Sequence, residues 1–273
     1  MVSIIITTKN EKDVIKRLID SIRNQSYQNL EIILVDNNST DGTFQIAKKM
    51  GIKVYTFGPE RSAQRNMGVK RSSGKYLMIL DADMVLQKDV VAECVAECEK
   101  DSSIGGIVIP EQSIGENFWE KVKAFERSFY NIEGDITTDA ARFFTREAFN
   151  KVEGYDESIT GPEDWDFPEN VRKNGFKLVR IKSKIYHYER IPSIRKLISK
   201  KYYYALKSHR YLGKNNISVF SPKTIYFLRP VFYRNFRILF SHPVLAIGMF
   251  FMLTLEQIAG GLGYIKGRLA NEK

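Results

Sequence analysis

The sequence is poor in cysteine, and its last third is poor in acidic residues. Two cysteines in 273 residues, Cys94 and Cys98, are too few for a disulfide framework or, by themselves, for a zinc site. No signal-peptide pattern precedes the strand-like segment 2–7, so we expect a cytoplasmic catalytic compartment. With 43% hydrophobic and 27% charged residues, the composition excludes disordered and fibrous proteins.

The scarcity of acids is confined to one part of the chain. Residues 190–273 hold 15 Lys and Arg but only two acids, Glu256 and Glu272, for a net charge of +13, whereas residues 1–189 have a net charge of −3. A near-neutral body with a basic tail indicates an anionic partner, either a membrane surface or nucleic acid. Because long apolar runs accompany these charges, the sequence favours lipid, and we expect no nucleic-acid partner.

Strands and helices alternate through the first part of the chain. Strands are predicted at the apolar runs 4–8, 31–35, 52–57 and 76–80. Helices are predicted between them, at 14–22, 43–49 and 61–71, with Asn10 as the cap of the first. The alternation predicts an α/β fold with a mostly parallel sheet and helices on both faces. Ligands bind such sheets at the carboxyl ends of the strands, where we expect the site.

Three of these strand ends carry polar or acidic side chains. The residues are Thr7, Thr8 and Asn10 after the first strand, Asp36 after the second, and Asp81 and Asp83 after the fourth. Two carboxylates one residue apart can hold a divalent cation, which neutralises a diphosphate. An isolated Asp-x-Asp triplet is also typical of a capped strand-to-helix turn, and a second triplet occurs at 164–166.

Five motifs in a fixed order make the pattern specific. They are Thr7-Thr8-Lys9-Asn10-Glu11, Val35-Asp36-Asn37-Asn38-Ser39-Thr40-Asp41-Gly42-Thr43, Gln64-Arg65-Asn66-Met67-Gly68, Leu80-Asp81-Ala82-Asp83 and Gly161-Pro162-Glu163-Asp164-Trp165-Asp166-Phe167. In this order and spacing they resemble the family 2 glycosyltransferases over about residues 1–189. The resemblance implies the Rossmann-like GT-A fold and a metal-dependent, inverting transfer of a sugar from a nucleotide-sugar.

The resemblance also implies roles for the residues that match its motifs. Nucleotide binding is implied for Thr7, Thr8, Asn10, Asp36, Arg65 and Asp81. Binding of a divalent metal, Mn²⁺ or Mg²⁺, is implied for Asp81, Asp83 and His187, although a single histidine on a strand is often structural. Asp164 is implied to be the catalytic base, with Glu163 beside it to orient the acceptor.

The residue types suit this chemistry. An acceptor hydroxyl needs a carboxylate to take its proton, and the acidic neighbours of Asp164 are expected to raise its pKa. A helix over about 164–173 would present Asp164 at its amino-terminal end. Trp165 is predicted to stack on an acceptor sugar, with packing beneath the helix as the alternative. Arg142 either reaches the donor or, as the sequence favours, forms a surface ion pair.

The basic tail is predicted to be helical. Ser193 is expected to cap a helix that runs to Leu212 and stops at Gly213, and 225–239 repeats its mixture of aromatic and basic residues, which is typical of interfacial helices. Residues 243–265 are long enough to span a bilayer, to lie in its interface, or to form a buried dimer interface. A polar Glu256 within lipid is costly unless paired, and an oligomer would provide the partner. The amphipathic helix 118–130 either covers the sheet or lies against the membrane.

These observations lead to one functional hypothesis and one alternative. We expect a catalytic domain at 1–189, membrane-interface helices at 190–240 and a membrane-anchoring or oligomerising segment at 241–273. The hypothesis is transfer of one sugar, of the mannose or glucose type, from a GDP- or UDP-sugar to a lipid-linked or glycan acceptor at the membrane, with the catalytic domain facing the cytoplasm. The Gln-x-x-Arg-Trp signature of processive synthases is absent. The alternative is a non-catalytic, nucleotide-binding scaffold that oligomerises through its tail.

Overall fold

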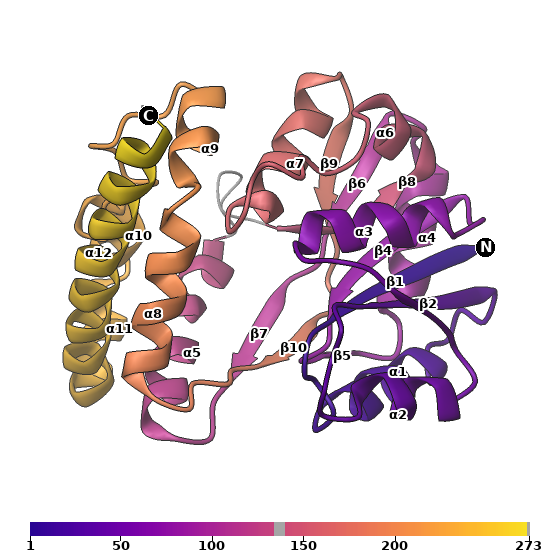
Figure 1. The fold of residues 1–273 in the computed structure, drawn as a ribbon, viewed down its shortest axis with the longest axis horizontal. Coiled ribbons are helices and arrows are strands. Elements are labelled where there is room, and N and C mark those ends of the chain that lie inside the picture. The colour runs from indigo at the N-terminus through magenta and orange to yellow at the C-terminus, as the bar shows by residue number, and fades with distance from the viewer. Residues whose placement is uncertain (134–139, 272–273) are drawn as a thin grey trace. The chain divides into compact units, whose positions relative to one another are not determined.

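A seven-stranded sheet forms the centre of the first of two units (Figure 1). The structure is a computed structural model that describes residues 1–133 and 140–271. Unit 1 comprises residues 1–111, 140–157 and 163–187, and unit 2 comprises the remaining described residues. The strands of the sheet are β1 (Val2–Thr8), β2 (Leu30–Asp36), β3 (Lys53–Thr56), β4 (Tyr76–Asp81), β6 (Ile104–Val108), β8 (Ala141–Thr145) and β9 (Lys177–Arg180).

The sheet is mostly parallel, as the sequence predicts. Its strand order is β3-β2-β1-β4-β8-β6-β9, and β8 runs antiparallel to both of its neighbours. Strands β1, β2, β3 and β4 pair in parallel, and so do β6 and β9. A further strand, β5 (Met84–Leu86), pairs antiparallel with β10 (Ile185–Tyr188).

Helices cover both faces of the sheet. They are α1 (Ile15–Arg23), α2 (Thr43–Lys49), α3 (Arg61–Lys70), α4 (Val90–Lys100), α6 (Arg146–Lys151) and α7 (Glu163–Lys173). Successive side chains of a strand point to opposite faces, so β1, which is buried throughout, contributes to two cores. Ile4 and Ile6 pack in the core that contains α1 and α4, whereas Ile5 packs in the core that contains α3, α6 and α7.

Strand register brings the polar strand ends to one edge of the sheet. In the parallel pairing, Thr8 of β1 lies opposite Asp36 of β2, and Thr7 lies opposite Asp81 of β4. On β10, His187 lies opposite Met84, the residue that follows Asp83. The register therefore gathers residues from distant parts of unit 1 at the carboxyl edge, where the sequence predicts the site.

Unit 2 is largely helical. Its elements are α5 (Phe118–Glu133), α8 (Ile194–Ala205), α9 (Ser208–Lys214), the 3₁₀ helix η1 (Tyr226–Leu228), α10 (Pro230–Arg234), α11 (Phe236–Ser241) and α12 (Pro243–Asn271), together with the strand β7 (Glu111–Ile114), whose first residue belongs to unit 1. Helices α5, α10 and α12 share one apolar core. Over residues 243–270, α12 is long and apolar enough to cross a membrane by length and composition, and an 18-residue window within it has a mean hydropathy of 1.6.

Local structure departs from the sequence prediction at two places. Asn10 does not cap α1, which begins five residues later without a side-chain cap. Asn10 instead adopts a left-handed backbone with φ = 57°, and its side-chain oxygen accepts a hydrogen bond from the Thr40 N–H at 2.9 Å. Asparagine tolerates this conformation well, so the residue shapes the loop between strand and helix.

The tail helices are also shorter than predicted. Ser193 caps α8 as expected, by accepting a hydrogen bond from the Lys196 N–H, but α8 ends at Ala205, and α9, which contains Gly213, follows separately. The predicted helix at 225–239 is divided into η1, α10 and α11: Pro230 holds Arg229 extended between η1 and α10, and the non-helical Asn235 separates α10 from α11. The division of the chain into segments 1–189, 190–240 and 241–273 stays a prediction.

Candidate active site

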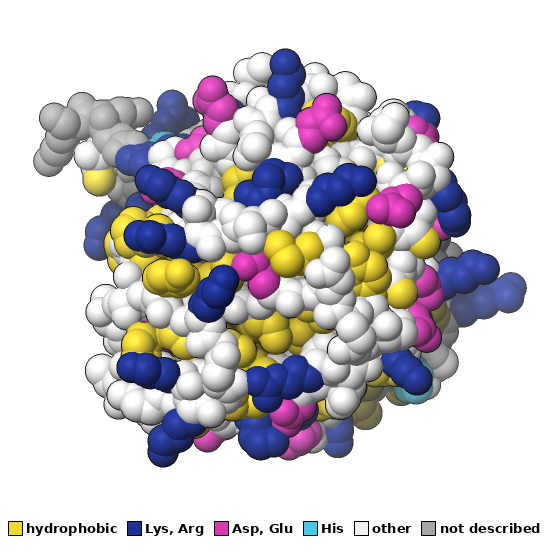
Figure 2. Space-filling model, turned by 90° about the vertical axis from the view of Figure 1, so that its right-hand side faces the viewer, with side chains coloured by type: hydrophobic (Ala, Val, Ile, Leu, Met, Phe, Trp, Pro, Cys, Tyr) yellow, Lys and Arg dark blue, Asp and Glu magenta, His cyan; other side chains and the backbone are white. Residues whose placement is uncertain are grey.

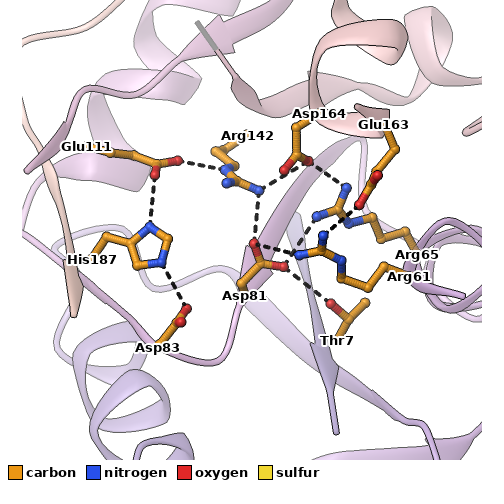
Figure 3. A network of polar contacts seen from close by, with 10 residues as sticks. All are labelled: Thr7, Arg61, Arg65, Asp81, Asp83, Glu111, Arg142, Glu163, Asp164 and His187. Carbon is orange, nitrogen blue, oxygen red and sulfur yellow. Dashed lines mark hydrogen bonds and ion pairs between the residues drawn. The ribbon is translucent and has the colours of Figure 1, made fainter. Parts of the chain in front are cut away.

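Asp81 is the centre of an ion-pair cluster at the carboxyl edge of the sheet (Figure 3). It ends the buried apolar strand β4, so its carboxylate emerges at the edge rather than in the core. The carboxylate lies 3.3 Å from Arg65 Nη2, 3.4 Å from Arg142 Nη1 and 4.0 Å from Arg61 Nη1. Burial alone would raise the pKa of Asp81, but Arg142, Arg65 and Arg61 outweigh it and hold that pKa well below its usual range.

Two of these arginines also hold Asp164, at the beginning of α7. Asp164 Oδ1 accepts a hydrogen bond from Arg65 Nη1 at 2.6 Å and from Arg142 Nη1 at 3.4 Å. Beside it, Glu163 Oε1 lies 3.0 Å from Arg61 Nη2. The structure therefore brings the predicted residues Arg65, Asp81, Glu163 and Asp164 together.

The electrostatics of Asp164 are opposite to the sequence prediction. Burial raises its pKa, as does the negative charge of Asp81, but the positive charges of Arg142 and Arg65 lower it by more. The prediction that acidic neighbours raise the pKa of Asp164 is therefore wrong: Glu163 pairs with Arg61, and the arginines come from positions remote in sequence. Asp164 is ionised at neutral pH in this arrangement.

A second group of side chains adjoins this cluster and includes two of the predicted metal ligands. His187 Nε2 lies 3.4 Å from Asp83 Oδ1, and His187 Nδ1 lies 3.1 Å from Glu111 Oε2. The other oxygen of Glu111 accepts a hydrogen bond from Arg142 Nε at 2.8 Å. Glu111 thus connects the histidine to the arginine cluster.

The chemistry of Asp83 and His187 fits a divalent metal. If His187 donates its Nδ1 proton to Glu111, its Nε2 lone pair faces the carboxylate of Asp83. An imidazole nitrogen and a carboxylate oxygen are ligands that Mn²⁺ accepts. The predicted set of three ligands is not assembled, because Asp81 faces the arginines, and within residues 1–133 and 140–271 no group of three His, Cys, Asp or Glu is placed to hold a metal.

The predicted nucleotide-binding residues on the other side of β1 form a hydrogen-bonded loop. Asp36 accepts hydrogen bonds from the Thr8 hydroxyl at 2.7 Å, from the Ser39 hydroxyl at 2.6 Å and from the Ser39 N–H at 2.7 Å. Asn10 holds the same loop through Ser39 and Thr40. Thr7, the next residue back along β1, instead donates a hydrogen bond to Asp81 at 3.5 Å.

Sequence reasoning missed three residues of the cluster. The sequence favours a surface ion pair for Arg142 over contact with the donor, but Arg142 is 4% exposed and contacts three carboxylates, so the prediction of a surface pair is wrong. The position of Arg61 could have been predicted from the sequence, because it precedes Arg65 by four residues and therefore lies on the same face of the helix. No feature of the sequence indicates that Glu111 belongs to the site, because its partner His187 is 76 residues away. Trp165 is half-buried on α7, and its acceptor role stays a prediction.

The sequence of the chain is similar to those of known glycosyltransferases. The model of the family described as glycosyl transferase family 2 matches residues 3–152. The chondroitin synthase of Escherichia coli is 29% identical over 179 residues, which are 61% of this chain and 26% of that protein. In Methanococcus voltae, the dolichyl N-acetyl-alpha-D-glucosaminyl phosphate 3-beta-D-2,3-diacetamido-2,3-dideoxy-beta-D-glucuronosyltransferase is 25% identical over 225 residues, 72% of this chain and 69% of that protein.

One solved structure of another protein superimposes on nearly the whole chain. It is the mannosyltransferase PcManGT from Pyrobaculum calidifontis in complex with GDP-Man and Mn²⁺, which superimposes with a TM-score of 0.60 at 17% identity over 99% of this chain and 80% of that one. This likeness establishes a shared fold. The chain spans only about a quarter of the length of the chondroitin synthase.

Proposed function

The chain belongs to glycosyl transferase family 2, and we propose on that basis that it transfers a sugar from a nucleotide-sugar to an acceptor hydroxyl. Its fold is the GT-A fold, with a mostly parallel sheet flanked by helices. The donor is a GDP- or UDP-sugar, with mannose as the first candidate because PcManGT was solved with GDP-Man.

One observation carries the proposal: Arg65 bridges Asp81 and Asp164. Its guanidinium group donates to Asp164 at 2.6 Å and to Asp81 at 3.3 Å, and the side chain is fully buried. A carboxylate that takes a proton from the acceptor must lie beside the carboxylate that serves the diphosphate, because bond formation and leaving-group departure occur at one carbon. Because the buried Arg65 contacts both carboxylates, it fixes the position of Asp164 relative to Asp81.

The cluster offers cationic groups for the diphosphate of the donor. Arg61, with a third of its side chain exposed, presents a guanidinium group at the edge of the sheet, whereas Arg65 lies buried behind it between Asp81 and Asp164. Guanidinium groups bind phosphates through paired, charge-assisted hydrogen bonds. Asp83 and His187 would hold a divalent metal, Mn²⁺ or Mg²⁺, which supplies charge neutralisation of the leaving diphosphate.

Asp164 is proposed as the general base of a single displacement that inverts the anomeric carbon. Its lowered pKa keeps it ionised, so it can accept a proton, but Arg65 and Arg142 also make it a weak base. A diphosphate beside the exposed Arg61 offsets part of the positive charge that lowers the pKa of Asp164 and thereby raises its basicity when the donor is bound. Glu163 orients the acceptor, and Trp165 stacks on it.

The acceptor is proposed to be a lipid-linked saccharide or a glycan at the membrane, with the catalytic unit in the cytoplasm. Support comes from the name of the Methanococcus voltae relative, which specifies a dolichyl-linked phosphate. The basic, apolar sequence of residues 190–271 supports a membrane partner.

A screen of nucleotide-sugars tests this function. The full chain is purified in detergent with Mn²⁺, and nucleotide release is measured from UDP- and GDP-sugars with polyprenyl-phosphate lipids as acceptors. Asp83→Ala and Asp164→Asn are each expected to reduce release by a factor of about 10³. The matched control is Asp166→Asn on the same helix, which is expected to retain activity. Nucleotide binding without turnover of any donor would instead favour a scaffold.

A further inference from the structure

The exposed side chains of α12 form one apolar stripe. From residue 244 to 265 they are Val244, Ile247, Phe251, Thr254, Ile258, Leu262 and Ile265. Steps of three and four residues place all of them on one face of the helix. At 1.5 Å per residue, this uncharged face is about 30 Å long.

The opposite face of α12 is packed against other helices of unit 2. A Cβ atom on Gly248 would lie 2.9 Å from Val122 of α5, and one on Gly263 would lie 2.4 Å from the Tyr202 carbonyl oxygen of α8. Both glycines therefore permit close helix contacts. Glu256 on this face is buried, where it lies 3.3 Å from Lys123 and accepts a hydrogen bond from the Tyr226 hydroxyl at 3.2 Å.

This packing answers two questions that the sequence leaves open. Glu256 has partners within its own chain, so it does not need an oligomer to satisfy it. The neighbouring helix α8 carries exposed Arg195, Lys196 and Lys200. If α12 crossed a bilayer with its packing intact, these cations would enter the hydrocarbon, where charged side chains are costly. The packed arrangement therefore leaves one face of α12 for lipid.

The charges and aromatic rings around the stripe indicate which class of lipid it binds. Glu256 is the only acid in residues 190–271 and is 2% exposed, so this part of the described chain presents essentially no carboxylate to solvent. Arg234 and Arg237 are exposed among exposed Tyr233 and Phe236. By contrast, cations and carboxylates are interspersed on the face drawn in Figure 2. Aromatic rings and cations together are suited to a headgroup layer with anionic phosphates.

We propose that α12 lies in the plane of an anionic bilayer and does not cross it. Its stripe is buried at the boundary between headgroups and acyl chains, and the arginines of α10 and α11 contact lipid phosphates. This proposal specifies how the chain binds the membrane, and it rests on the proposed function only for the presence of a membrane partner. Docking itself does not require sugar transfer.

Vesicle flotation with the full chain tests the surface. Binding is expected to vesicles of phosphatidylglycerol and phosphatidylcholine, and the double variant Ile247→Glu, Ile258→Glu is expected to lower the partition coefficient by about tenfold or more. Lys70→Glu, on the exposed surface of unit 1, is the control because it changes the net charge by the same amount. Unchanged binding of the double variant, or wild-type binding equal on pure phosphatidylcholine, would overturn the proposal.

Cysteine labelling distinguishes an in-plane helix from a spanning one. Ser241→Cys and Arg268→Cys place single exposed thiols near the two ends of α12, and the native Cys94 and Cys98 are buried. With protein bound to the outside of sealed vesicles, both thiols should react with an impermeant maleimide. Protection of either thiol until detergent is added would mean that α12 spans the bilayer.

Different outcomes would refute docking and the proposed function. Failure of the wild type to float, combined with a dimer in sedimentation that the double variant dissociates, would assign the stripe to a second copy of the chain. Donor turnover in detergent would persist in that case. Conversely, vesicle binding without turnover would leave docking intact and refute the transferase.

Discussion

Glu111 accepts a hydrogen bond from Arg142 at 2.8 Å, and this pair joins the two halves of the site. Its second carboxylate oxygen lies 3.1 Å from His187 Nδ1. A carboxylate behind a metal-ligating histidine fixes the orientation of the ring and the nitrogen that is free to bind. The pair therefore connects the proposed metal ligands to the proposed base.

Replacement of Glu111 by glutamine is expected to weaken Mn²⁺ binding by about 10- to 100-fold. The variant retains side-chain size but loses the charge that orients His187 and pairs with Arg142. Mn²⁺ affinity is measured by electron paramagnetic resonance, with Glu116→Gln, on an exposed glutamate five residues further along the chain, as the control. An unchanged Mn²⁺ affinity alongside normal binding by the control would contradict this role for Glu111.

Arg142→Ala is expected to lower the free energy of unfolding by about 3–5 kcal/mol, because it leaves Asp81, Asp164 and Glu111 with fewer compensating charges. Urea denaturation measures the loss. Lys16→Ala removes an exposed ion pair with Asp20 and should change stability by about 0.5 kcal/mol at most. A loss below about 1 kcal/mol for Arg142→Ala would mean that water replaces the guanidinium group.

Stability is expected to fall with acidification partly through Glu31. Although burial would raise the pKa of Glu31, hydrogen bonds from Ser3 and Ser73 lower it to about 2 from a usual 4.5. A depressed folded-state pKa gives stability that is complete above the unfolded pKa and is lost as the pH falls from about 5 to 2. Because water screens this partly exposed group, we expect a contribution of about 1–2 kcal/mol.

Denaturation of wild type and Glu31→Gln across this pH range measures the effect. The difference in unfolding free energy should be largest near pH 6 and should shrink toward pH 2. A constant difference between the two proteins would show that Glu31 acts through packing rather than charge.

Glu256→Gln is expected to destabilise the chain by about 1–3 kcal/mol. The substitution removes the charge that faces Lys123, although Lys123 retains Glu126 at 3.1 Å. Thermal or urea unfolding in detergent gives the value. Thr254→Val on the exposed face of α12 is the control and should be nearly neutral, since only its hydroxyl bond to the Phe250 carbonyl is lost. Equal effects of the two variants would argue against the buried ion pair.

The α/β architecture was accessible from sequence because its signals are local. Alternating apolar strands and helical stripes occur within 10–20 residues, and parallel pairing then places Thr7, Asp36 and Asp81 at one edge. The same reasoning located Asp164 at the start of α7. The prediction of a mostly parallel sheet with helices on both faces is confirmed.

The electrostatics of the site were not accessible, because they depend on contacts between distant segments. Neighbours in sequence made Asp164 look like a carboxylate among carboxylates, whereas Arg65 and Arg142 come from α3 and β8. Arg142 looked like a surface residue because a single charge in a strand carries no periodic signal. In the tail, Pro230 accounts for the break before α10, and between α8 and α9 the Ser208 hydroxyl donates a hydrogen bond to the Ala205 carbonyl, a local contact that helix propensity does not describe.

The last two residues of β1 contact carboxylates on two different strands. Thr7 reaches Asp81 and Thr8 reaches Asp36, so consecutive residues, whose side chains leave a strand in opposite directions, serve two different carboxylates. The alternation of side chains along this strand is therefore a structural constraint. Deleting one residue from β1 would turn both threonines and the apolar side chains before them to the opposite faces of the sheet, which would disrupt both carboxylate contacts and both hydrophobic cores at once.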